Sequence, residues 1–160
     1  YITESDELVA KVLLDKDSPF LKSLIVNKGS KDKVSLGMAV LDENYLVGKI
    51  VEVNYTTSRV LLISDLNSKI PVIIEPGNVQ SILSGSGKDQ GVIQYFRSSR
   101  EITSDNIVFT SGSGGIFKAG IPIGKIENVQ TNKNYNTDFF SNLDQLTFVK
   151  LVSYQKESKN

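Results

Sequence analysis

The sequence predicts an all-β protein, and three observations lead to this fold class. Apolar residues alternate with polar residues over runs of strand length, which is the period of a half-buried strand. Turn residues interrupt these runs about every 8 to 12 residues, as in sandwiches and small barrels. Only residues 18–23 and 142–146 could hold a helical turn. The expected architecture is therefore a β-sandwich or a pair of small barrels.

The expected strands follow one another through nearly the whole chain. Most are rich in β-branched residues, and Gly, Asn, Asp or Pro clusters such as 27–32 and 85–91 bound them. In chain order they are residues 9–14, 24–26, 38–41, 46–53, 59–63, 70–74, 81–84, 92–96, 107–110, 121–126 and 146–152. The polar residues 1–7 are expected to fray, and residues 155–160 to form a solvated tail.

A short motif occurs twice at a spacing that suggests two similar β units. Gly48-Lys49-Ile50 returns as Gly124-Lys125-Ile126, and a turn, a strand and another turn precede each copy. A glycine inside a strand of a small barrel permits the kink or bulge that closure requires. The repeat predicts two units of comparable size, although so short a match can also arise by chance.

Composition excludes several classes of function. Eighteen acidic residues balance eighteen basic ones, which leaves no basic excess for a nucleic-acid surface. The chain has no His, Cys or Trp. Serine–histidine triads, histidine metal sites, cysteine zinc sites and disulfides are therefore excluded. The longest apolar runs have the length of a strand, so neither a membrane-spanning helix nor a signal peptide is expected. The chain begins at Tyr1, and we expect it to be part of a longer protein.

The remaining routes to catalysis are weak. Ser-x-x-Lys occurs at Ser30/Lys33 and Ser153/Lys156, about as often as chance predicts for a chain with this many serines and lysines. Asp15 with Asp17 lacks the pattern of a calcium loop and is expected to be a solvated turn. A pair of glycosidase carboxylates is possible by composition, but no two acidic residues stand out.

The glycine-rich segments do not match phosphate-binding or nucleophile motifs. Residues 120–126 have three residues between the glycines, and Ile126 stands where a phosphate loop needs Ser or Thr. Residues 112–115 lack the glycine that a nucleophile elbow needs two residues before Ser113. We expect tight β turns here. A loop flanking a binding surface and displaying Ile116 and Phe117 is the functional alternative.

Read together, these motifs resemble the MreC family of bacterial rod-shape-determining proteins. The resemblance rests on residues 24–34, 37–40, 46–50, 58–68, 70–72, 110–112, 115–117 and 120–126, in the family's order and spacing, and it spans about residues 10–152. Lys33 and Lys118 stand where the family usually has Gly and Pro, and Asp105-Asn106 replaces a Gly-Asp pair. These positions are turns, so altered turn types with an intact fold are expected.

The resemblance implies two small six-stranded β-barrels, reminiscent of trypsin-like proteases but without catalytic groups. We expect the first barrel in residues 1–70, with a possible return strand from 143–154, and the second in 71–142. The family's role implies a scaffold that self-associates and links MreB and MreD to peptidoglycan-elongating synthases, notably the elongation-specific penicillin-binding protein. It also implies a periplasmic position, with an upstream helix as anchor. No cofactor and no metal are expected.

The expected functional residues fall into two groups. Turn or kink glycines are Gly29, Gly37, Gly48, Gly112, Gly115, Gly120 and Gly124. A candidate interaction surface comprises Tyr95, Phe96, Ile116 and Phe117, although for each of these residues a place in the core is the favoured interpretation. A Ser/Lys hydrolase and a direct peptidoglycan-binding module remain the alternatives to a scaffold, although the absence of Trp leaves few stacking platforms for glycan.

Overall fold

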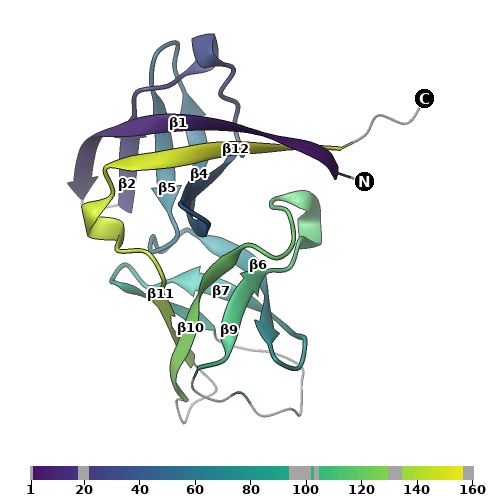
Figure 1. Cartoon of the computed structure of the whole chain (residues 1–160). Helices are drawn as coiled ribbons and strands as arrows, with labels where there is room; N and C mark the ends of the chain where they lie inside the picture. The colour runs from purple at the N-terminus through teal and green to yellow at the C-terminus, as the bar shows by residue number, and fades with distance from the viewer. Residues whose placement is uncertain (1, 18–21, 94–101, 103–104, 130–134, 157–160) are drawn as a thin grey trace.

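The chain folds into two closed antiparallel β-barrels, as the computed structural model shows (Figure 1). The structure describes residues 2–17, 22–93, 102, 105–129 and 135–156, of which residues 2–6, 14–17, 128, 129, 155 and 156 are described by their backbone alone. Each barrel has six strands. The all-β prediction and its two-barrel form are confirmed.

Barrel one combines the beginning and the end of the chain. Its strands are β1 (Ile2–Asp17), β2 (Lys22–Val26), β3 (Ala39–Asp42), β4 (Tyr45–Val53), β5 (Ser58–Leu62) and β12 (Phe148–Lys156), in the order β1-β12-β3-β4-β5-β2. β1 pairs with β12 through its first part and with β2 through its second part, with a register shift between Val12 and Leu14. In Figure 1 the β1–β12 pair crosses the upper barrel as one long ribbon that carries both termini.

Barrel two is built from one continuous segment. Its strands are β6 (Lys69–Glu75), β7 (Val79–Gly85), β8 (Gln90–Ile93), β9 (Ile107–Thr110), β10 (Pro122–Val129) and β11 (Tyr135–Phe139), in the order β10-β11-β8-β7-β6-β9. The chain passes from barrel one to barrel two between Leu62 and Lys69. Whether residues 1–70 and 71–142 fold as separate domains stays a prediction.

The repeated motif occupies equivalent strands of the two barrels. Gly48 of β4 pairs with Leu62, and Gly124 of β10 pairs with Phe139; a register shift follows Ile50 in one strand and Ile126 in the other. In this pairing a Cβ at Gly48 would meet the backbone oxygen of Leu61, and one at Gly124 that of Asp138. The glycines are thus needed because a neighbouring strand passes too close for any side chain.

Every expected strand overlaps an observed one, but the chain ends and one strand differ from the prediction. β1 begins at Ile2 and β12 ends at Lys156, because the two ends pair with each other instead of fraying. β11, in the polar stretch Tyr135–Phe139, was not predicted; it is held between β8 and β10 by pairing on both sides. Short 3-10 turns lie at η1 (Ser30–Asp32), η2 (Ser113–Gly115) and η3 (Leu143–Gln145), of which only η3 was expected.

The buried residues of the two barrels form one continuous hydrophobic cluster. Alternate residues point inward in strands such as β6, where Ile70, Val72 and Ile74 are buried. The cluster passes from barrel to barrel through residues such as Met38 and Phe117, which lie where the barrels meet. The contact between the barrels is therefore part of the core.

Candidate functional site

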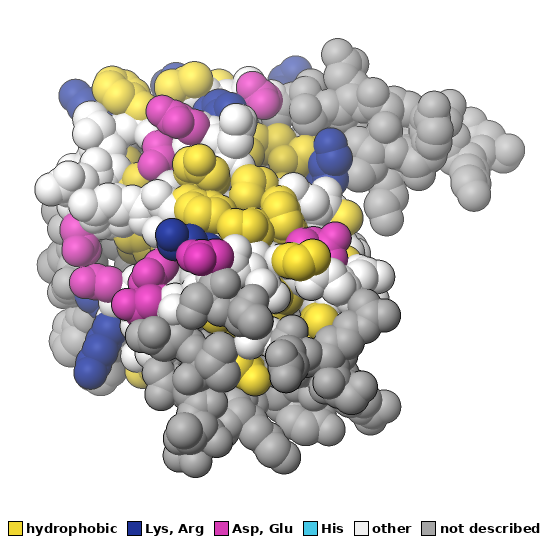
Figure 2. Space-filling view, turned by 60° about the horizontal axis from the view of Figure 1, so that its bottom comes forward, with side chains coloured by type: hydrophobic (Ala, Val, Ile, Leu, Met, Phe, Trp, Pro, Cys, Tyr) yellow, Lys and Arg dark blue, Asp and Glu magenta, His cyan; other side chains and the backbone are white. Residues whose placement is uncertain are grey.

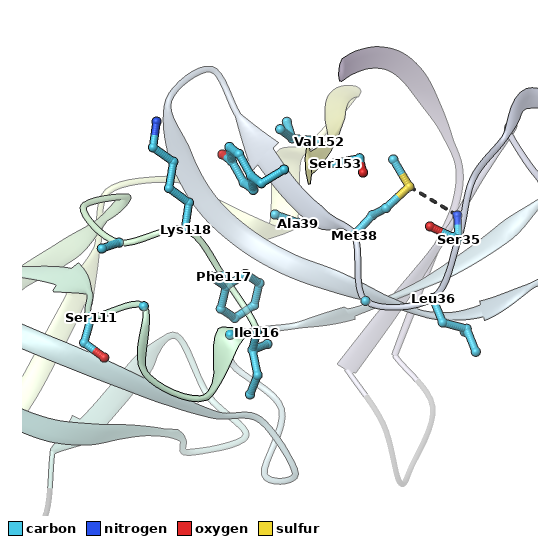
Figure 3. Close-up of a pocket in the computed structure, with 15 residues that line it drawn as sticks. Ser35, Leu36, Met38, Ala39, Ser111, Ile116, Phe117, Lys118, Val152 and Ser153 are labelled. Atoms are coloured by element: carbon cyan, nitrogen blue, oxygen red, sulfur yellow. Dashed lines mark hydrogen bonds between the residues drawn. The ribbon is translucent and has the colours of Figure 1, made fainter. Parts of the chain in front are cut away.

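A cleft of about 430 Å³ lies between the two barrels, and it is the candidate site (Figure 3). One wall is the loop of residues 111–120 between β9 and β10, which contains η2. The other wall comes from barrel one: residues 35–39 before and in β3, and residues 152–154 of β12. Segments far apart in the sequence thus meet at one place.

The base of the loop is fixed by Thr110, a buried residue at the end of β9. Its backbone N–H donates to the carbonyl of Ile121 at 2.9 Å, and its hydroxyl donates to the carbonyl of Lys118 at 2.6 Å. The same hydroxyl accepts from the N–H of Ile121 at 2.9 Å. The buried Thr110 hydroxyl therefore acts both as a donor and as an acceptor. These bonds hold the two ends of the loop together at the end of β9.

The predicted glycines fall into two structural groups. Gly37, Gly112, Gly115 and Gly120 have left-handed backbones, with φ of 87°, 80°, 68° and 91°. At Gly112 a Cβ would also lie 3.0 Å from the Cβ of Ala119, across the narrow neck of the loop. Gly29, Gly48 and Gly124 instead lie against the backbone of a neighbouring segment.

The loop places its two large apolar residues differently. Figure 3 shows Ile116 and Phe117 side by side on the loop facing barrel one. Phe117 is only 8% exposed and belongs to the packing between the barrels, whereas Ile116 is 42% exposed. Leu36, on the opposite wall, is 68% exposed. Ile116 and Leu36 are therefore the apolar side chains that a partner could reach here. Tyr95 and Phe96 lie outside the described residues.

Two residues that line the cleft, Lys118 and Tyr154, contact each other across the two barrels. The Lys118 ammonium lies 5.7 Å from the centre of the Tyr154 ring, within the range of a cation–π interaction. Burial raises the pKa of the Tyr154 phenol above its ordinary value of 10.0, and the carboxylate of Glu7 adds to the shift. Lys118, which stands where the family usually has Pro, thus contacts barrel one through its side chain.

Two of the chemistries considered from the sequence, a metal site and a serine–lysine dyad, can be compared with the described residues. Within the described part of the chain, no group of three or more acidic residues is arranged to hold a metal ion. A serine–lysine dyad depends on a buried lysine, but Ser30 and Lys33 are both exposed at the two ends of η1. Ser153 lies in the cleft wall, and the side chain of Lys156 is outside the described set. No helix in the described residues is long and apolar enough to span a bilayer.

Comparison with known proteins identifies the family. The description "Rod shape-determining protein MreC, barrel core" matches residues 12–153. The cell shape-determining protein MreC of Cereibacter sphaeroides is 36% identical over 115 residues, which is 72% of this chain and 38% of that protein. The chain thus spans well under half the length of this relative.

Solved structures show the same fold. MreC from Pseudomonas aeruginosa superposes with a TM-score of 0.83 at 26% identity, covering 91% of this chain and 98% of that one. The major periplasmic domain of a cell shape-determining filament MreC gives 0.83 at 21% identity, covering 95% and 100%. MreC from Helicobacter pylori, solved in complex with the penicillin-binding protein PBP2, gives 0.71 at 16% identity, covering 92% and 98%.

The match covers both barrels, including the two strands that carry the repeated glycine and the loop that lines the cleft. This chain belongs to the MreC family of rod shape-determining proteins, and residues 12–153 are its barrel core.

Proposed function

We propose that this chain is a non-catalytic scaffold of the peptidoglycan-elongation machinery, which binds a penicillin-binding protein on the periplasmic side of the cytoplasmic membrane. Family membership supports this role, together with the H. pylori relative, which was solved in complex with PBP2. The absence of His and Cys fits a protein that acts by being bound. MreD and MreB would be reached through a membrane-anchored segment upstream, and copies of the scaffold would associate with one another.

The cleft between the barrels is the proposed place for the synthase. It is lined by exposed apolar side chains on both walls, and ligand sites are usually largely formed before the partner binds. Figure 2 draws one face of the molecule without marking the cleft on it, and it shows hydrophobic side chains gathered there with acidic and basic side chains around them. Such a composition, apolar in the centre and charged at the rim, is typical of protein interfaces.

A binding titration tests this proposal. The periplasmic part of the elongation-specific penicillin-binding protein is immobilised, and the 160-residue chain is titrated to tens of micromolar. Ile116→Asp and Leu36→Asp should each weaken binding about tenfold or more, because each places a charge in a desolvated contact. The matched control is Ile82→Asp, at a 46% exposed position of β7 in barrel two.

Two results would contradict the proposal. Absence of binding at tens of micromolar removes the synthase as partner, and retention on purified peptidoglycan in its place would favour a glycan-binding module. Binding that Ile116→Asp and Leu36→Asp leave unchanged would move the contact away from the cleft.

A further inference from the structure

A second cavity, of about 520 Å³, is lined by residues of both barrels and shares no lining residue with the cleft. Barrel one contributes the start of β2 and the end of β5, and barrel two contributes the turn between β7 and β8, the end of β11 and the segment that follows it. Its volume is that of a small-ligand site, and such sites occur preferentially between domains. We name it the polar cavity, because its lining includes the charged residues Lys22, Lys88, Asp89, Asp138 and Asp144.

Buried hydrogen bonds tie the walls of the polar cavity to one another. Asp65, which is 2% exposed in the connection between the barrels, accepts from the backbone N–H of Lys22 at 2.7 Å and from that of Asn67 at 2.8 Å. The carbonyl of Ser64, in the same connection, accepts from the N–H of Gly87 at 2.8 Å. The connection is thereby bonded to β2 of barrel one and to the β7–β8 turn of barrel two. Such preorganisation of a site lowers the entropy cost of binding.

Side chains of both signs of charge line the polar cavity. Among the described residues, the carboxylates of Asp89 and Asp144 and the ammonium of Lys88 form no ion pair. The side-chain amide of Gln90 donates to Oδ1 of Asp138 at 2.6 Å, which fixes the position of this third carboxylate. Charge-assisted hydrogen bonds are about twice as strong as neutral ones. A ligand with an ammonium and a carboxylate would therefore find a group of opposite charge for each.

Ser141 provides an independent indication that the polar cavity takes a polar ligand. It lines the cavity and is 8% exposed, and within the described part of the chain its hydroxyl has no hydrogen-bond partner. A buried hydroxyl without a partner is unfavourable. Rotation to another staggered position about the Cα–Cβ bond changes where this hydroxyl points. A ligand that offers hydrogen-bonding groups inside the cavity would therefore satisfy a group that the fold leaves unpaired.

We propose that the polar cavity binds a short peptide that carries both an ammonium and a carboxylate, of the kind that peptidoglycan strands bear as stem peptides. The ammonium would pair with the carboxylates of the cavity and the carboxylate with Lys88, while Leu62 and Phe139 line the same cavity and suit the methylene groups of such a peptide. This inference rests on the proposed function in peptidoglycan elongation, which brings stem peptides to the chain. It adds a binding partner at a place separate from the cleft.

Amide chemical shifts of the isotope-labelled chain test the proposal. The probe is the N-acetylated tripeptide L-alanyl-γ-D-glutamyl-meso-diaminopimelate, titrated to about 10 mM. Amides around the polar cavity should shift with a Kd of about 1 mM, which suffices for a peptide that the polymer presents in many copies. The same tripeptide with its side-chain amine acetylated should bind about tenfold more weakly, because the amide that replaces the ammonium no longer pairs with a carboxylate.

Substitutions in the cavity locate the binding. Asp144→Asn and Lys88→Gln each remove one charge at an exposed position and should weaken binding about fivefold. Asp42→Asn, at the end of β3, and Lys31→Gln, in η1, make the same chemical changes away from the cavity and should leave binding unchanged. Ser141→Ala should weaken binding about threefold without lowering the Tm of the free chain, because the hydroxyl has no partner there among the described residues.

Three results overturn the proposal. The first is an absence of shifts around the polar cavity at about 10 mM tripeptide, and the second is binding that Asp144→Asn and Lys88→Gln leave unchanged. The third is an equal response to a trimer of N-acetylglucosamine, which carries neither charge and would assign the cavity to glycan. The titration contains no penicillin-binding protein and alters no cleft residue. Loss of synthase binding with retained peptide binding would therefore contradict only the scaffold role, and the reverse result only the peptide site.

Discussion

Barrel one and barrel two have the same strand arrangement but are assembled from the chain in different ways. Barrel two is one continuous segment from Lys69 to Phe139, whereas barrel one needs β12, which arrives after the whole of barrel two has been made. Contacts between distant segments cost more chain entropy to form than local ones. Barrel one is thus completed by the last part of the chain, and its closing strand also supplies one wall of the cleft.

The backbone bonds show how closely the two barrels correspond. The N–H of Ile50 donates to the carbonyl of Met38 at 3.0 Å, and the N–H of Ile126 donates to the carbonyl of Asn106 at 2.8 Å. In each barrel the same isoleucine is fully buried and precedes a register shift. The two barrels therefore share one architecture and differ mainly in how the chain connects their strands.

The largest effect is expected from removing β12. A chain truncated after Leu146 loses the strand that pairs with both β1 and β3, together with the buried Val149, Leu151 and Val152. Barrel one should lose its fold, because an opened small barrel exposes its core and two unpaired strands. Barrel two should keep slow amide exchange, which hydrogen-exchange mass spectrometry would resolve segment by segment. The control truncation removes residues 157–160 only and should leave both barrels protected.

This truncation also tests the predicted domain boundaries. If the amides of β2 to β5 stay protected from exchange without β12, barrel one does not need the expected return strand in order to fold. If β6 to β11 lose protection as well, the two barrels are one cooperative unit and residues 71–142 are not a separate domain.

The next largest effect is expected at the repeated glycines. Gly48→Ala and Gly124→Ala each direct a Cβ into a backbone oxygen of the adjacent strand, which cannot move without breaking the barrel. Each should lower the free energy of unfolding by about 3 kcal/mol, measured by urea denaturation. Gly115→Ala is the control: its φ is 68°, but no atom lies within 4 Å of an added Cβ, so a cost of about 1 kcal/mol is expected. Tolerance of one glycine substitution but not of the other would show that the two motifs are not equivalent.

The sequence predicted the strands better than the surfaces. Periodicity located the strands because alternate residues such as Ile70, Val72 and Ile74 must enter a core. It missed β11, where Asn136 and Asp138 hide the pattern and pairing on both sides supplies the stability. The repeated glycine motif was visible, but the close backbone oxygens that require it were not.

The candidate site shows the same limit. The sequence around Gly112 and Ile116 predicted a glycine-rich loop that displays apolar side chains. No local pattern predicts that Phe117 is buried in the folded chain while Ile116 stays exposed. Leu36 and the cleft itself depend on segments that are more than a hundred residues apart, as with Gly37 and Tyr154. Exposure of Val9 and Phe148 likewise depends on the pairing of the first strand with the last.

A smaller effect is expected where the two barrels differ at one buried position. Ile50 pairs with Val60 in barrel one, whereas the equivalent Ile126 pairs with Thr137 in barrel two. Both side chains are fully buried, and the Thr137 hydroxyl has no hydrogen-bond partner among the described residues. Thr137→Val should therefore stabilise the protein by about 1 kcal/mol, and Val60→Thr should destabilise it by a similar or larger amount. Thermal unfolding of both variants measures this, and a loss of stability in Thr137→Val would mean that the hydroxyl is satisfied.

The smallest effect is expected at Tyr154, where barrel one meets the loop of barrel two. Burial, with a further contribution from Glu7, raises the pKa of its phenol above the ordinary 10.0 in the folded state. Since the unfolded chain releases this proton at a lower pH than the folded one, stability is complete below about pH 10 and is lost as the pH rises through the folded pKa. Tyr154→Phe should make stability less dependent on pH between about pH 9 and pH 11, measured by urea denaturation at each pH.

Lys118 extends this last test to the contact between the barrels. Its ammonium lies over the Tyr154 ring, so Lys118→Met removes the cation–π contact and should cost about 0.5 to 1 kcal/mol at neutral pH. The double variant with Tyr154→Phe should cost less than the two single costs added, because each single change weakens the same contact and that contact can be lost only once. Strictly additive costs would mean that the lysine and the tyrosine act independently, and that Phe117 with the rest of the buried contact carries the coupling between barrel one and barrel two.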